Sequence, residues 1–183
     1  MNGLLLDMVN SPDSSDGYAP MDTPIGRLFV AFRGAAVTAV GRSPAAVEAS
    51  VRARFTRPVR RVPALPEPLA GAVAEHLHGD GRSALRFDLG SLPAFERAVL
   101  RTVLEIPRGE VRSYAWVARE VGQPHAAKEV GLALGRNPIP LLIPCHRVVY
   151  SEGRLGGYIF GGRAKRALLL GEGVGLEASG RVA

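Results

Sequence analysis

The sequence predicts an α/β protein in two parts, a mixed N-terminal part of strands and helices and a mostly helical C-terminal part. Large apolar residues at positions 28, 30 and 32 alternate with the residues between them, which is typical of a strand. Residues 94–106 instead repeat apolar side chains at the spacing of one helical face. The sequence Ser-Leu-Pro at 91–93 separates the two patterns and marks the boundary. The 183 residues suit one domain of ordinary size or two small ones.

The N-terminal part begins with residues 1–20, which are rich in Ser, Asp, Gly and Asn and predict a flexible tail. The domain proper spans 21–90, and its strands form a hairpin or meander between Pro24 and Val40. Two helices and one strand complete it, over 44–55, 69–78 and 85–89. Four prolines make 57–68 a loop or an edge strand.

The C-terminal part, residues 91–175, is predicted to hold three helices, over 94–106, 114–121 and 124–134. Ser91 is a candidate N-cap for the first of them. The short turn around Gly122 between the other two fits a helix-turn-helix, although pattern alone favours an ordinary αα-hairpin. Residues 176–183 are expected to form a C-terminal tail.

The single cysteine excludes an intrachain disulfide and a zinc site made of several cysteines, and it favours a reducing compartment. No basic residue precedes the Leu4-Leu5-Leu6 run, so no signal peptide is predicted. No apolar stretch reaches the roughly 20 residues that span a bilayer. We therefore expect a cytoplasmic protein that has no membrane partner.

The positive charge is concentrated in the C-terminal part. The net charge is +6, and residues 93–175 hold 12 Arg or Lys against 7 Asp or Glu, an excess of five. A basic surface attracts phosphate backbones, which makes nucleic acid a candidate partner. The alternative is a generic basic surface in an arginine-rich protein.

The sole cysteine lies in Pro144-Cys145-His146-Arg147-Val148, directly after the apolar run 139–143. A thiol becomes a nucleophilic thiolate beside a base or in a positive field, and a neighbouring histidine can supply either. Adjacent side chains of an extended strand point to opposite faces, so His146 can act on Cys145 only if the pair lies on a turn or at a helix start. The alternative is a cysteine that serves as a small buried hydrophobe.

Three stretches of the C-terminal part carry a shared pattern: Gly109-Glu110-Val111-Arg112-Ser113-Tyr114, Ala126-Ala127-Lys128-Glu129-Val130-Gly131, and residues 136–149 around the cysteine. Together they resemble one family, the O6-alkylguanine-DNA alkyltransferases, which are methylated-DNA–protein-cysteine methyltransferases. The resemblance extends over Leu92 to Gly173 without apparent gaps. Thr23-Pro24-Ile25-Gly26 and the strand after it are similar, more weakly, to the start of that family's N-terminal domain.

The resemblance implies a ribonuclease-H-like α/β N-terminal domain and a mostly α, winged helix-turn-helix C-terminal domain. It implies that the protein flips O6-alkylguanine out of double-stranded DNA and keeps the alkyl group on Cys145, acting once and without a cofactor. The family pattern suggests a monomer that clusters along DNA. Some members hold a structural zinc ion with cysteines and histidines, but this chain has only His76 and His78 in the corresponding region, so no zinc is predicted.

The same resemblance assigns the site residues. Cys145 is the acceptor, His146 deprotonates it through a water molecule, and Glu172 orients His146. Tyr114 donates a proton to guanine and helps to displace the nucleotide, and Asn137 supports the cysteine loop. The residues assigned to the base pocket are Leu134, Pro140, Val148 and Tyr158, and those assigned to DNA are Ala126, Ala127, Lys128, Gly131, Arg136 and Arg147.

Lys128 departs from the family, in which an arginine usually occupies the space left by the flipped base. Lysine keeps the charge but lacks the planar fork that stacks and donates to the unpaired base. This departure keeps a second hypothesis open, a sensor that binds alkylguanine without transfer. A third hypothesis is a cysteine hydrolase that uses Cys145 and His146 and needs an oxyanion hole. Phe160 is expected either to narrow the pocket entrance or to pack at the domain interface.

Overall fold

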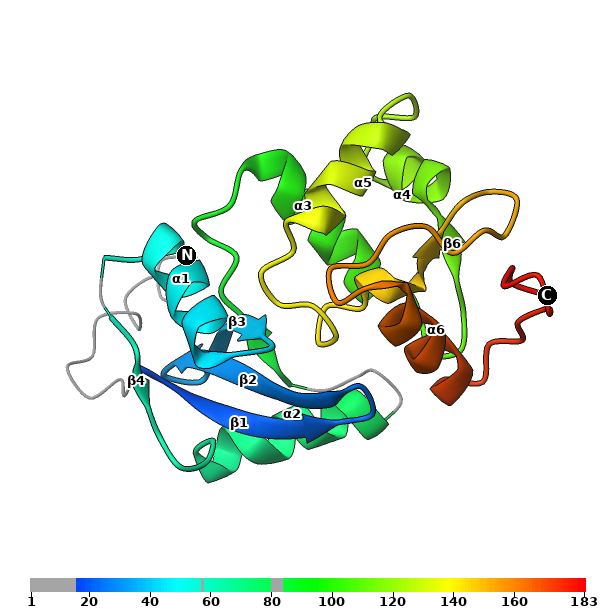
Figure 1. Cartoon of the computed structure of the whole chain (residues 1–183). Helices are drawn as coiled ribbons and strands as arrows, with labels where there is room; N and C mark the ends of the chain where they lie inside the picture. The colour runs from blue at the N-terminus through cyan, green and yellow to red at the C-terminus, as the bar shows by residue number, and fades with distance from the viewer. Residues whose placement is uncertain (1–15, 57, 80–83) are drawn as a thin grey trace.

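The computed structural model describes residues 16–56, 58–79 and 84–183 (Figure 1). The N-terminal part is a five-stranded sheet with the strand order β4-β1-β2-β3-β5. Its centre is an antiparallel meander, and a short parallel strand flanks it on each side. The strands are β1 (Gly17–Thr23), β2 (Gly26–Arg33), β3 (Ala36–Gly41), β4 (Arg60–Arg61) and β5 (Arg86–Phe87).

The predicted tail over residues 1–20 is wrong in its last part. Residues 1–15 lie outside the described part of the chain, but β1 already begins at Gly17. Tyr18 and Ala19 are buried, and β1 pairs with β2 along its whole length, from Gly17 opposite Phe32 onward. Because polar residues precede β1 and its apolar residues are covered only in the folded sheet, the sequence pattern assigned the start of this strand to the tail.

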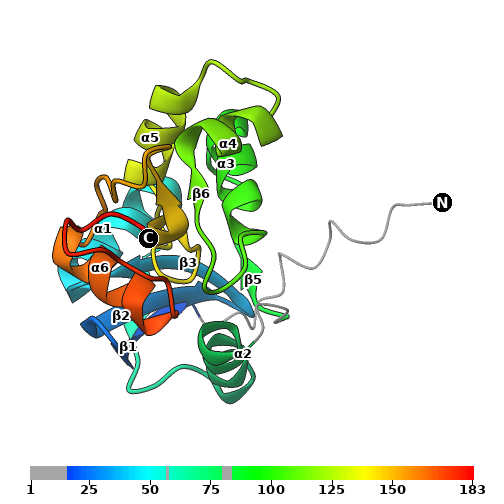
Figure 2. The same ribbon diagram turned by 90° about the vertical axis from the view of Figure 1, so that its right-hand side faces the viewer.

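The alternation over residues 28–33 sends side chains to both faces of the sheet, and a helix covers each face. Leu28, Val30 and Phe32 pack with α2 (Glu67–His78) in the larger core cluster. Ala31 belongs to a smaller cluster with α1 (Pro44–Arg54). Figures 1 and 2 show α2 beneath the sheet and α1 against the opposite face.

Local capping determines where α1 begins but not where α3 begins. Ser43 caps α1 by accepting a hydrogen bond from the Ala46 amide at 3.2 Å, and Pro44 occupies the first turn. The N-cap of α3 (Ala94–Leu104) is Pro93, so the prediction that Ser91 caps this helix is wrong. The Ser91 hydroxyl instead accepts a hydrogen bond from Nε of Arg54 at 2.9 Å, a contact that local sequence does not encode.

The C-terminal part packs three helices around the loop that carries the cysteine. The helices α3, α4 and α5 contact one another, and α4 and α5 are joined by a short turn. The remaining elements are β6 (Arg112–Ser113), α4 (Tyr114–Glu120), α5 (Ala127–Gly135), the 3₁₀ turn η2 (Cys145–Arg147), β7 (Val148–Val149) and α6 (Gly162–Gly171). The strands β6 and β7 pair in parallel.

The predicted C-terminal tail, residues 176–183, is paired with the rest of the protein through its backbone. Leu176 and Val182 form a bridge, and Val182 donates its amide hydrogen to the Gly153 carbonyl at 2.9 Å. These bonds hold the segment against the turn that follows β7. Its polar sequence gave no sign of this pairing, because the partner backbone lies about 30 residues away in the chain.

The two parts share one core and are also linked by a hydrogen bond between their backbones. The larger core cluster runs from the sheet and α2 into α3, α5 and the cysteine loop. The amide of Val40 in β3 donates to the Pro138 carbonyl at the start of that loop, at 2.8 Å. The sheet therefore supports the loop directly. Within the described part of the chain, no helix has both the length and the apolar character needed to cross a membrane.

Candidate active site

Cys145 begins the 3₁₀ turn η2 and is 5% exposed. Its amide donates to the Ile143 carbonyl at 2.8 Å, and the amide of Arg147 donates to the Pro144 carbonyl at 2.9 Å. The cysteine and histidine therefore lie on a turn, as the argument from side-chain directions required. The pair therefore meets the condition under which His146 could act on Cys145.

Asn137 is the polar support of the cysteine loop. Its side-chain amide nitrogen lies 3.2 Å from both the Ile143 carbonyl and the sulfur of Cys145. Its side-chain oxygen accepts the Ile139 amide at 2.9 Å. The residue is buried, and it is not the C-cap of α5, which is Arg136. A hydrogen bond to sulfur stabilises the thiolate over the thiol.

His146 and Glu172 form a buried pair. Nε2 of His146 lies 2.9 Å from Oε1 of Glu172. A carboxylate only accepts, so Nε2 carries the hydrogen. Burial lowers the pKa of His146, which leaves the imidazole neutral and its Nδ1 atom unprotonated. Among the described residues Nδ1 has no hydrogen-bond partner, so this buried nitrogen is available to accept a proton.

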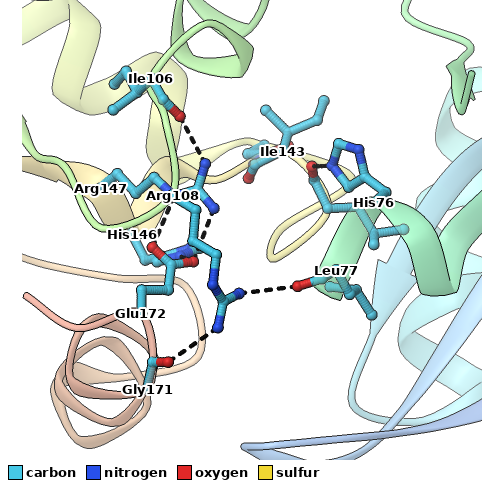
Figure 3. Close-up of polar contacts among 11 residues, drawn as sticks. His76, Leu77, Ile106, Arg108, Ile143, His146, Arg147, Gly171 and Glu172 are labelled. Carbon is cyan, nitrogen blue, oxygen red and sulfur yellow. Dashed lines mark hydrogen bonds and ion pairs between the residues drawn. The ribbon is translucent and has the colours of Figure 1, made fainter. Parts of the chain in front are cut away.

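Arg147 holds the other side of the same carboxylate (Figure 3). Its Nε and Nη2 atoms lie 2.9 Å from Oε2 and Oε1 of Glu172, and Nη1 donates to the Ile106 carbonyl at 2.7 Å. The side chain is 13% exposed. The prediction that Arg147 contacts DNA is therefore wrong, because its guanidinium is used inside the protein.

The pKa of the Glu172 carboxyl group is strongly shifted by this network. Burial by itself raises its pKa, but the hydrogen bonds and charges of His146 and Arg147 outweigh burial and hold the pKa at about 2. Glu172 is therefore ionised at neutral pH, and it keeps the donor hydrogen on Nε2 of His146.

Lys165 is a buried cation on α6 that the sequence argument missed. Its Nζ donates to the carbonyls of Val148 at 2.6 Å and Gly157 at 3.2 Å. Burial lowers its pKa to about 8, and the charge of Cys145 raises it. Lys165 shares the buried face of α6 with Leu168 and Leu169, so helical periodicity was the signal that could have revealed it.

The thiol of Cys145 has a pKa raised to about 11, because burial outweighs the hydrogen bond from Asn137 and the charge of Lys165, which both lower it. At neutral pH the resting group is consequently a thiol. A nucleophile forms when the proton leaves the sulfur, and the neutral imidazole of His146 is the base next to it in the chain. The sulfur of Cys145 can therefore act as a nucleophile only after its proton has been transferred.

A cavity of about 650 Å³ opens at Cys145. That volume lies in the range of pockets that hold a ligand the size of a nucleobase. Seven of the predicted site residues line this cavity, namely Tyr114, Ala127, Lys128, Gly131, Leu134, Cys145 and Tyr158.

The other predicted residues lie around the cavity rather than in its wall. Pro140 and Val148 are buried, and the Val148 carbonyl is the acceptor of Lys165. Ala126 precedes α5. Arg136 is 67% exposed on its side chain and pairs with Glu96 at 2.9 Å. Its exposed position is compatible with a contact to a phosphate.

Tyr114 lines the cavity next to a residue that was not predicted. Its ring centroid is 5.2 Å from that of Tyr150, which is 44% exposed and also lines the cavity. A Cβ at Gly156 would lie 2.9 Å from the Tyr114 hydroxyl, so this close approach needs a glycine. Burial, followed by Tyr150 and Cys145, raises the pKa of Tyr114 to about 12, which makes it a hydrogen donor at neutral pH.

Phe160 packs at the interface between the two parts and does not line the cavity at Cys145. The guanidinium of Arg42 lies 5.0 Å from its ring centroid and donates to its carbonyl at 3.0 Å. Of the two expectations for Phe160, the interface contact is the one that the structure supports. Arg42 thereby links the end of β3 to the loop that carries Tyr158.

Sequence comparison places the C-terminal part in a known family. Residues 94–174 match the family described as 6-O-methylguanine DNA methyltransferase, DNA binding domain. A methylated-DNA–protein-cysteine methyltransferase of Mycobacterium tuberculosis is 37% identical over 158 residues, which cover 83% of this chain and 89% of the relative. The Mycobacterium leprae protein of the same name is 39% identical over 156 residues, covering 82% and 87%.

Solved structures share the architecture over most of the chain. The crystal structure of Mycobacterium tuberculosis OGT in complex with DNA aligns with a TM-score of 0.70 and 32% identity, covering 86% of this chain and 93% of that one. The O6-methylguanine-DNA methyltransferase of the archaeon Pyrococcus kodakaraensis aligns with a TM-score of 0.67 and 25% identity, covering 86% and 99%. This chain therefore has the mixed sheet and the helices of those proteins.

Proposed function

This chain belongs to the methylated-DNA–protein-cysteine methyltransferase family, and we propose that it repairs O6-alkylguanine in DNA by moving the alkyl group to Cys145. It is a DNA-repair transferase whose partner is DNA and whose acceptor is a cysteine of the protein itself. The observation that carries the assignment of Cys145 is its position: the only cysteine of the chain lies in the cavity wall, with Asn137 on its sulfur and the His146–Glu172 pair next to it.

In the proposed reaction, Cys145 first loses its proton to Nδ1 of His146, directly or through a bridging water molecule. The thiolate then attacks the alkyl carbon, so the S–C bond forms as the O6–C bond breaks. The electron pair stays on guanine, which takes up a proton and becomes ordinary guanine. The thioether has no route back to a thiol in this site, so each molecule acts once.

The surrounding groups are proposed to act on charge and proton positions. The Glu172 carboxylate stabilises the imidazolium formed at His146, and Arg147 keeps that carboxylate in place. Lys165 and Asn137 stabilise the thiolate. The Tyr114 hydroxyl, protonated at neutral pH, is the proposed donor to the departing guanine.

A duplex base must leave its stack to reach Cys145, which costs a few kcal/mol. We propose that Ala126 and the α5 residues Ala127, Lys128 and Gly131 face DNA. Leu134 and Tyr158, which line the cavity, are proposed to receive the flipped base, together with Pro140 and Val148 around it. Arg136 contributes an exposed charge beside them.

We propose further that residues 21–90 form a ribonuclease-H-like domain and that residues 91–175 form a winged helix-turn-helix domain with α4 and α5 as its two helices. The mixed five-stranded sheet supports the first assignment, and the short turn between α4 and α5 supports the second.

Mass spectrometry tests the proposal directly. Incubation with a duplex that contains O6-methylguanine is expected to add one methyl group to Cys145, in a stoichiometry that never exceeds one per chain. The Cys145→Ala variant is the control and should gain no mass. Binding of the lesion without a mass change would favour a damage sensor, and repeated turnover of an ester or amide would favour a cysteine hydrolase.

Replacing Lys128 with arginine tests whether this position fills the space of the flipped base. Lys128 is exposed on α5 and lines the cavity at Cys145. Arginine adds a planar group that stacks and donates two hydrogen bonds, so Lys128→Arg is expected to raise the transfer rate on duplex DNA about threefold. The free base O6-methylguanine needs no flipping and should react at an unchanged rate. Equal acceleration of both substrates would refute this role.

A further inference from the structure

The last turn of α2 reaches from the N-terminal part to the loop that carries Cys145. Nε2 of His76 lies 2.6 Å from the Leu142 carbonyl oxygen, three residues before the cysteine. A carbonyl oxygen only accepts, so Nε2 carries a hydrogen and donates it. The His76 ring also meets the ring of Phe87 in β5 edge-on, with the centroids 5.5 Å apart. Figure 3 shows the imidazole directed at this loop.

The loop segment that His76 holds is strained. Leu141 has a φ of 76° and is the one residue other than glycine, among those the structure describes, with a positive φ. A side chain with a Cβ occupies this left-handed region only when neighbouring contacts hold it there. Asn137 holds Ile143 after the strained residue, and Val40 holds Pro138 before it. The Leu142 carbonyl, between these supports, is the atom that His76 holds.

The end of α2 is itself anchored to the helix that leads into Glu172. Arg108 donates from Nη1 to the Leu77 carbonyl at 2.9 Å and from Nη2 to the Gly171 carbonyl at 3.0 Å (Figure 3). Both carbonyls belong to the last turns of their helices, α2 and α6, where a positive charge is favourable. The helix end that carries His76 is thus tied to the carboxylate side of the site.

We propose that His76 is a positioning residue for alkyl transfer, which holds the Leu142 carbonyl and thereby keeps the strained cysteine loop in its reactive conformation. This inference rests on the proposed function. His76 lines a separate cavity of about 360 Å³, and that cavity shares no lining residue with the one at Cys145. Its loss should therefore change the rate of transfer and leave DNA binding intact.

The test compares His76→Phe with the wild type in single-turnover transfer from duplex O6-methylguanine. Phenylalanine keeps an aromatic ring next to Phe87 and removes the Nε2 donor to the Leu142 carbonyl. The limiting rate constant is expected to fall about 10-fold while the apparent Kd for DNA stays within about twofold. His76→Gln, whose amide can donate to the same carbonyl, should recover most of the rate. His78→Phe, the same change at an exposed histidine of the same helix end, is the matched control and should have no effect.

The strain provides a second test through a double-mutant cycle. Glycine adopts a positive φ without cost, so the penalty of His76→Phe should shrink when it is combined with Leu141→Gly. The proposal would be overturned if His76→Phe had the same limiting rate as the wild type. It would also be overturned if His76→Gln lost as much of the rate as His76→Phe. If His76→Phe fails to fold, the smaller His76→Met replaces it in the same comparison.

Modification of the only cysteine by iodoacetamide separates this proposal from the assigned function. A wild type that takes no methyl group from DNA would refute the assigned function, yet slower carboxamidomethylation of Cys145 in His76→Phe would still support the positioning role. A wild type that does take the methyl group, together with equal iodoacetamide and transfer rates in both proteins, would refute the positioning role alone.

Discussion

Glu172→Gln is expected to slow alkyl transfer about 100-fold, because a carboxamide cannot serve both partners of the carboxylate. The two oxygens of Glu172 accept from Nε2 of His146 and from Nε and Nη2 of Arg147. Glutamine has one acceptor oxygen. If this oxygen turns to Arg147, the amide nitrogen faces His146 and favours the tautomer with the hydrogen on Nδ1, which removes the base. Single-turnover kinetics on duplex O6-methylguanine measure the loss.

The same variant is expected to lose about 3 kcal/mol of stability at pH 7, because Arg147 remains buried without its counter-ion. The pKa of Glu172 is about 2 in the folded protein, below its ordinary value of 4.5. A depressed pKa of this kind stabilises the fold above the unfolded value, and the stabilisation is lost as the pH falls through 4.5 toward 2. The difference in unfolding free energy between the two proteins should therefore shrink below about pH 4.5.

Glu110→Gln is the matched control for this prediction. Glu110 pairs with Arg112 at 2.6 Å, but its side chain is 48% exposed, and exposed pairs contribute little. Urea unfolding should leave this variant near the wild type at every pH. A Glu172→Gln protein that transfers methyl at the wild-type rate would show that the carboxylate does not orient the base.

Lys165→Met is expected to raise the pH at which Cys145 becomes reactive and to slow transfer at pH 7 about 10-fold, the factor that one pKa unit represents. The Lys165 cation lowers the pKa of the thiol, so its removal disfavours the thiolate. Little change in stability is expected, because relief of a buried charge offsets the loss of two hydrogen bonds to the Val148 and Gly157 carbonyls.

The effect of Lys165→Met on the reactivity of Cys145 is expected to depend on pH. Lys165 has a pKa of about 8, so in the wild type its charge supports the thiolate below that pH and is lost above it. The ratio of wild-type to Lys165→Met rates with iodoacetamide should be largest below pH 8 and approach one above it. The Asn137 amide that donates to the sulfur is unchanged in both proteins, and so are Tyr114 and Tyr158, which interact electrostatically with Cys145. Lys165→Arg, which keeps the charge, should retain most of the rate, and a rate as low as that of Lys165→Met would argue for a purely steric role.

Local periodicity was sufficient to predict the elements that frame the site. The helices α1 and α3 and the alternation in β2 follow repeats of 3.6 and 2 residues. The condition that Cys145 and His146 lie on a turn also follows from neighbouring residues alone, and the pair does lie on the turn η2. These features depend only on side-chain directions along a few consecutive residues, which the local backbone geometry determines.

Contacts between distant segments decided the rest. Arg147 is a neighbour of His146 in sequence, yet its guanidinium binds Glu172, which is 25 residues away. The buried Lys165 and the His76 contact across the two parts also depend on carbonyls that only folding brings near. A charged side chain binds whichever acceptor the packed core presents to it, and periodicity along the chain holds no information about that choice.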